Sequence, residues 1–273
     1  MEQIHPHLKA ALMCHAPIVI PAIAGSRARD CAASTEAMRQ CASFLLQGSP
    51  DGVLVVSPHT PRLPDRFGVV AGHGQVGGSF APFGVPEVQL TLPSPPDLIR
   101  AFASAAAPID VLELDHGALV PLWFLAEAGW RGPTVVFSLP MRPTDRSLEA
   151  FGEALAAITA HLGGRWSLVA SGDMSHRLKP GAPAGYDPRA ASFDAHVVAH
   201  VRAGDWAGAI DIDPELRAIA AEDVLDSLTI AAAAGGWRNN GHQVFAYEGP
   251  FGVGYLNAAL YDWLAAGSTG GSR

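Results

Sequence analysis

The sequence predicts an α/β fold, in which helices flank a central, mostly buried β-sheet within a single domain. Short apolar runs alternate with longer segments of helical periodicity, which is the pattern of strand, helix, strand units. Five of the runs end in a histidine or a carboxylate, followed by Gly or Pro. These polar residues come from both ends of a 273-residue chain, so we expect one domain over residues 1–266 and a disordered Gly/Ser-rich tail over residues 267–273.

The segment Asp51–Pro61 shows the change from strand to loop most clearly. Val53–Val56 is a short apolar run of the kind found in strands covered on both faces. The prolines on either side of His59 prevent any regular continuation, so the imidazole is presented from the end of the strand. Ala10–Met13 repeats the pattern, since it leads into His15 with a proline two positions further on.

Three later runs end in the same way. Ile109–Leu114 leads into Asp115-His116-Gly117, Trp166–Ala170 leads into Ser171-Gly172-Asp173-Met174-Ser175-His176, and Gln243–Tyr247 leads into Glu248. In open α/β sheets ligands bind outside the carboxyl ends of the strands, so we expect the five ends to share one site. For any single residue the alternative is a local structural role.

Helices are expected where apolar residues recur at a spacing of three to four. The clearest is Arg146–Leu162, which Gly163 terminates, and Asp213-Pro214 provides an N-cap with proline at the first helical position. Short extended pieces are expected from Phe67 to Leu92 and a strand over Pro133–Leu139. The full set of expected helices is Arg29–Leu46, Asp97–Ala107, Leu119–Ala128, Arg146–Leu162, Phe193–Val201, Asp213 to about Ala234, and Tyr255–Leu264.

Composition excludes several classes of protein. The chain carries 18 basic and 26 acidic residues, a net charge of −8, and no basic run, which argues against a nucleic-acid partner. Three cysteines do not form a disulfide framework. No stretch has the length of a membrane span and the N-terminus lacks the pattern of a signal peptide, so we expect a soluble, cytoplasmic protein with no membrane partner.

The polar strand ends contain a possible metal-ligand set. His15, His59 and Glu248 would give two imidazoles and one carboxylate, which on one face of an octahedral ion leave three adjacent positions open, as in non-haem iron(II) oxygenases. The alternative for Glu248 is a capping or backbone-bonding role at a turn. The string Gly72–Gly77 fits a dinucleotide motif, but the prolines that follow exclude the helix such a site needs.

The ordered set of motifs resembles the class III extradiol ring-cleavage dioxygenases, the protocatechuate 4,5-dioxygenase beta-chain superfamily, from about Leu8 to about Leu264. The resemblance implies that His15 and His59 are imidazole ligands and Glu248 the carboxylate ligand of iron(II). It further implies that His176 is the acid/base histidine, that His116 lies near substrate and dioxygen, and that the protein is a homo-oligomer. The superfamily also includes Memo-type proteins, in which a cysteine is expected as the third ligand.

The expected activity is therefore dioxygen-dependent cleavage of the ring of a catechol or a 2-aminophenol next to the diol, in an extradiol dioxygenase-like catalytic domain. A Memo-like metal-binding protein without ring cleavage and a zinc-dependent hydrolase remain as alternatives. Asp115 and Asp173 either orient their neighbouring histidines or cap the turns that follow them.

Overall fold

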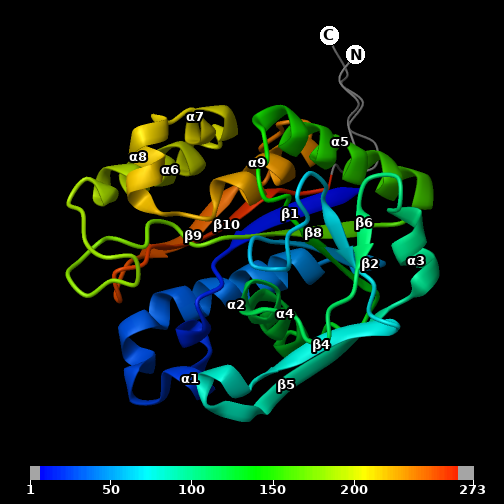
Figure 1. Ribbon diagram of the computed structural model, residues 1–273, viewed down its shortest axis with the longest axis horizontal. Helices are drawn as coiled ribbons and strands as arrows, with labels where there is room; N and C mark the ends of the chain where they lie inside the picture. The colour runs from blue at the N-terminus through cyan, green and yellow to red at the C-terminus, as the bar shows by residue number, and fades with distance from the viewer. Residues whose placement is uncertain (1–6, 264–273) are drawn as a thin grey trace.

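The computed structural model describes residues 7–263, which form a sheet of eight strands in the order β6-β3-β7-β2-β8-β1-β10-β9 with helices on both faces (Figure 1). The four central strands β7, β2, β8 and β1 run parallel to one another. This confirms the predicted α/β class. Their bounds are β1 Leu8–Met13, β2 Gly52–Ser57, β7 Thr134–Ser138 and β8 Trp166–Ser171.

The outer strands include one large departure from the sequence prediction. Tyr255–Leu264 was expected to be a helix, but Tyr255–Tyr261 is strand β10, which pairs antiparallel with β1 on one side and with β9 on the other. Every residue of β10 is buried, so it lacks the polar face of a surface helix. The other outer strands are β3 Gly68–Val70, β6 Ala107–Ile109 and β9 Gln243–Glu248.

Side chains point to alternate faces of the sheet along each strand, so the hydrophobic core is divided into two clusters, one on each face. In β1, Leu8, Ala10 and Leu12 join the cluster that includes α5, α6 and α9, while Ala11 and Met13 join the cluster that includes α2 and α4. Figure 1 shows α5 and α9 above the sheet and α2 and α4 below it. The bounds are α2 Ala32–Leu46, α4 His116–Glu127, α5 Asp145–Leu162, α6 Ala190–Ala203 and α9 Leu225–Ala234.

Three expected elements are shorter or divided. The helix expected over Asp97–Ala107 ends early, because α3 stops at Ala101 and Ala107 begins β6. The run Ile109–Leu114 is not a strand beyond its first residue. The helix expected from Asp213 to Ala234 is two helices, α8 and α9, separated at Ala221, which has a left-handed φ of 53°. The remaining helices are η1 Pro17–Val19, α1 Pro21–Ala24, η2 Gly25–Cys31, α3 Pro96–Ala101, α7 Trp206–Ile210 and α8 Pro214–Ala220.

A two-stranded ribbon lies outside the main sheet, below α4 in Figure 1. It consists of β4 Gly74–Phe80 and β5 Val85–Ser94, joined by the short helix η3 Ala81–Phe83. The Gly72–Gly77 string falls in β4 and the turn before it. Within residues 7–263 no helix has the length and apolar character of a membrane span. The tail expected over residues 267–273 lies outside the described residues.

Candidate metal centre

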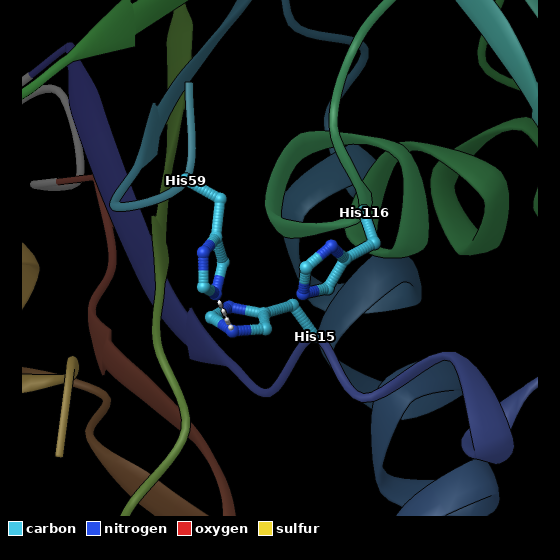
Figure 2. Close-up of side chains that lie close together, drawn as sticks. All are labelled: His15, His59 and His116. Atoms are coloured by element: carbon cyan, nitrogen blue, oxygen red, sulfur yellow. Dashed lines mark hydrogen bonds between the residues drawn. The ribbon is translucent and has the colours of Figure 1, made fainter. Parts of the chain in front are cut away.

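Three of the predicted site histidines converge at one edge of the sheet (Figure 2). His15 follows β1, His59 follows β2, and His116 is the first residue of α4. Each offers a ring nitrogen, and these nitrogens all lie within 4.8 Å of one another. The convergence follows from topology, because β1 and β2 run parallel on either side of β8 and so end at the same edge.

Asp223 supplies a carboxylate to this cluster. Its Oδ2 lies 3.1 Å from Nε2 of His59 and 3.4 Å from Nε2 of His15, and the two Nε2 atoms are 3.1 Å apart. Two donor atoms about 2.2 Å from one ion, at right angles to each other, are about 3.1 Å apart. The triangle of two imidazole nitrogens and one carboxylate oxygen therefore fits a single divalent ion, with the three donors on one face.

Glu248 does not take the place that the sequence suggested. Its Oε1 accepts hydrogen bonds from the backbone N–H (2.7 Å) and the hydroxyl (2.6 Å) of Ser34, in the first turn of α2. Within residues 7–263, the carboxylates at ion-pair distance from His15 or His59 belong to Asp173 and Asp223. The reason is strand order: β9 ends at the correct edge, but β10 separates it from β1, and neighbouring strands are about 4.8 Å apart.

Asp223 was missed because it lies in the break between α8 and α9, where the sequence continues a helical pattern. The neighbouring Glu222 stabilises the chain conformation at this break between the two helices. Its Oε2 accepts from the backbone N–H groups of Val224 (2.6 Å) and Leu225 (2.8 Å) and so caps α9, while its Oε1 accepts from Nε of Arg217 at 2.6 Å. The sequence gives no signal of the break, because Leu216, Ala220, Val224 and Leu228 keep helical spacing through it.

His15 is fully enclosed and lies between two carboxylates. Asp173 Oδ1 accepts from the His15 backbone N–H at 2.9 Å, and Asp173 N–H donates to Asp223 Oδ1 at 2.7 Å. Burial opposes a charged imidazole, but Asp173 and Asp223 outweigh it and raise the pKa of His15 to about 9. The pocket therefore favours a positive charge at this position, either a proton or a cation.

His116 has the opposite environment. Burial, and then the neighbouring His15 and His59, lower its pKa to about 4, so this imidazole is neutral near pH 7. Asp115 caps α4, because its carboxylate accepts a hydrogen bond from Ala118 N–H. The same carboxylate accepts from the hydroxyls of Ser57 and Thr60, and none of these three bonds involves the His116 ring. Gly117 is required here, because a Cβ would lie 2.6 Å from Ser57 Oγ.

His176 is half-buried and its Nδ1 is buried without a hydrogen-bond partner. Other residues fix the loop that carries it: His176 N–H donates to Ala220 O at 2.9 Å, and Ser175 N–H donates to Asp194 Oδ1 at 2.9 Å. The Asp173 carboxylate accepts from the His15 backbone N–H and the Asp173 backbone N–H donates to Asp223, and neither of these hydrogen bonds involves the His176 ring. A buried polar atom without a partner is unusual in a folded protein and is often explained by a functional role.

The fold and the cluster define an α/β protein with three histidines and a carboxylate at one sheet edge. The chain matches the family described as the catalytic LigB subunit of aromatic ring-opening dioxygenase over residues 9–258, and it belongs to that family. This confirms the resemblance to the class III extradiol superfamily.

The chain is also similar to two other proteins. Protein CA_C1420 of Clostridium acetobutylicum is 26% identical over 260 residues, which cover 89% of this chain and 55% of that protein, so the chain spans about half the length of this relative. The crystal structure of uncharacterized protein JW3007 from Escherichia coli K12 aligns with a TM-score of 0.58 and 17% identity, covering 92% of this chain and 99% of the other. The second likeness shows a shared fold.

Proposed function

We propose that the protein is a non-haem iron(II) dioxygenase that opens the ring of a catechol or 2-aminophenol next to the diol. The observation that carries the proposal is the triangle formed by His15 Nε2, His59 Nε2 and Asp223 Oδ2. Two imidazoles and a carboxylate on one face of an ion are the donor set of non-haem iron oxygenases. Membership of the ring-opening dioxygenase family supports the same reaction class.

In this proposal Asp223 replaces Glu248 as the carboxylate ligand. Iron(II) in the site would activate dioxygen and make a chelated phenol more acidic. The charge environment suits it, since Asp173 and Asp223 already stabilise a positive charge on His15. A metal ion would displace that proton, because the same Nε2 lone pair binds both.

His176 is the proposed general base. The His176 imidazole accepts the proton of a substrate hydroxyl and later returns it, which is the usual role of a histidine in acid/base catalysis. His116, neutral at pH 7, accepts a hydrogen bond from a substrate hydroxyl through its unprotonated ring nitrogen, or donates one to dioxygen through its ring N–H. The two histidines thus have separate roles, one that moves a proton and one that orients the reactants.

Phe83 is the proposed wall of the substrate site. It lies at the tip of the β4–β5 ribbon, 40% exposed, with its ring centre 5.8 Å from that of His116. Phe80, fully buried beside it at 6.3 Å, anchors this tip. An exposed ring beside the histidine cluster offers an aromatic substrate a surface for stacking.

The three-histidine cluster favours one alternative. His15, His59 and His116 could hold a zinc ion through three imidazoles with a fourth position for water, which is the donor set of some zinc hydrolases. In that case His116 would be a ligand, and its replacement would release the metal. Under the dioxygenase proposal His116→Ala retains the metal and lowers turnover.

The deciding experiment is anaerobic reconstitution with iron(II), followed by oxygen uptake with a panel of catechols and 2-aminophenols. The proposal expects uptake that depends on iron and on substrate, and that His59→Ala abolishes through loss of metal. Stoichiometric metal without oxygen uptake across the panel would instead support a Memo-like binding protein. Hydrolysis by the zinc-loaded protein would support the hydrolase.

A further inference from the structure

A hydrogen-bond chain leads from the first turn of α4 to the ring of His15. Ser171, the last residue of β8, donates its hydroxyl to Gly117 O at 2.5 Å and lies 3.0 Å from Nδ1 of His15. Because the hydroxyl proton is directed to Gly117, the lone pairs of Ser171 Oγ remain for His15. Nδ1 therefore donates its proton to Ser171 Oγ, so Nε2, which lies beside His59 and Asp223, is the ring nitrogen of His15 that can bind a metal.

The carbonyl of Gly117 is available because of Pro121. In an α-helix the N–H of residue 121 would bond to the carbonyl of residue 117, but proline has no N–H and its ring pushes that carbonyl away from the helix axis. Pro121 lies inside α4, where proline is otherwise destabilising. Because Pro121 cannot donate a hydrogen bond, the Gly117 carbonyl oxygen accepts the one from the Ser171 hydroxyl.

We propose that Ser171, held by the carbonyl that Pro121 leaves free, is a positioning residue that fixes the ring orientation and tautomer of His15 for metal binding. The inference rests on the metal centre proposed above. Ser171 touches neither substrate nor metal, and acts through His15. Both groups are fully buried, so water does not compete for the Nδ1 hydrogen bond.

The test compares Ser171→Ala with Ser167→Ala. Ser167 is a matched control, because it lies on the same strand, is fully buried, and donates its hydroxyl to a carbonyl, that of Leu45, at 2.6 Å. Zinc, added to the apo-protein in competition with a chelating dye, is the probe of affinity. Nitrogen NMR of the zinc-loaded, histidine-labelled protein, with His15 assigned from a His15→Gln variant, reports which ring nitrogen of His15 keeps its proton and which binds zinc.

Ser171→Ala is expected to weaken zinc binding by about 10- to 100-fold and to give His15 signals of mixed tautomers, while Ser167→Ala keeps native affinity. Pro121→Ala, which restores the competing N–H, is expected to change both readouts in the same direction by less, and it decides the question if Ser171→Ala fails to fold. Native affinity and an unchanged tautomer in these variants would overturn the inference. Neither readout needs oxygen or substrate, so absent ring cleavage would contradict the proposed function alone.

Discussion

Asp194 provides a quantitative test of how the His176 loop is held. This carboxylate is 1% exposed and accepts hydrogen bonds from Ser175 N–H and, at 2.7 Å, from the Tyr247 hydroxyl. Burial raises its pKa to about 6, although both hydrogen bonds favour the charged form. Since the unfolded value is about 3.9, the folded state binds the proton more tightly, and stability falls as pH rises from about 4 to about 6.

The shift of about two pKa units corresponds to about 3 kcal/mol once Asp194 is fully ionised. Asp194→Asn removes this ionisation, while the amide oxygen still accepts from Ser175 N–H. The difference in unfolding free energy between variant and native protein should therefore move in favour of the variant by about 2 kcal/mol between about pH 4.5 and pH 7.5.

Urea denaturation of the metal-free proteins across this pH range measures the difference. Asp211→Asn, at an exposed position, is the control for a carboxylate-to-amide change as such. A difference between native protein and Asp194→Asn that stays constant with pH would refute the reasoning, because it would mean that Asp194 titrates alike in both states.

Four further predictions concern the site. Asp223→Asn should weaken iron(II) binding by more than about 100-fold while Glu248→Gln leaves it unchanged, and equal loss in both, measured by metal content after desalting, would contradict the assignment. His176→Ala should keep its iron and lower kcat by about 10² to 10⁴, so unchanged turnover would remove it from the mechanism. Phe83→Ala should raise KM for catechols by about 3- to 10-fold with kcat little affected, whereas the exposed Tyr186→Ala should not; equal effects would exclude stacking at Phe83. Arg217→Ala leaves the buried Glu222 carboxylate unpaired, so it should lower unfolding free energy by about 2 kcal/mol and weaken metal binding about tenfold; loss of stability with native affinity would show that the break around Asp223 does not depend on this ion pair.

The sequence was sufficient for the elements whose character is local. Proline and glycine bound the runs before His15 and His59, and parallel strands bring such ends to one edge, so the convergence of the two imidazoles could be predicted. The same rule did not locate Glu248, because an eight-stranded sheet has a long edge and the sequence does not give the strand order.

Two of the sequence predictions were wrong for the same reason: tertiary contacts outweighed the local sequence pattern. Ala221 takes a left-handed conformation although it is not a glycine. Hydrogen bonds from the His176 N–H to Ala220 O and from the first N–H groups of α9 to Glu222 stabilise this break, which directs Asp223 to the histidines. The mostly apolar segment Tyr255–Tyr261 is a strand because β1 and β9 offer backbone partners on both sides.

The most direct test of the account is a crystal structure of the protein loaded anaerobically with iron(II), with the metal located by anomalous scattering at the iron edge. The account predicts one peak within about 2.0 to 2.3 Å of His15 Nε2, His59 Nε2 and an Asp223 carboxylate oxygen, with Glu248 still bonded to Ser34. An iron ion coordinated by Glu248, or bound without Asp223, would contradict it.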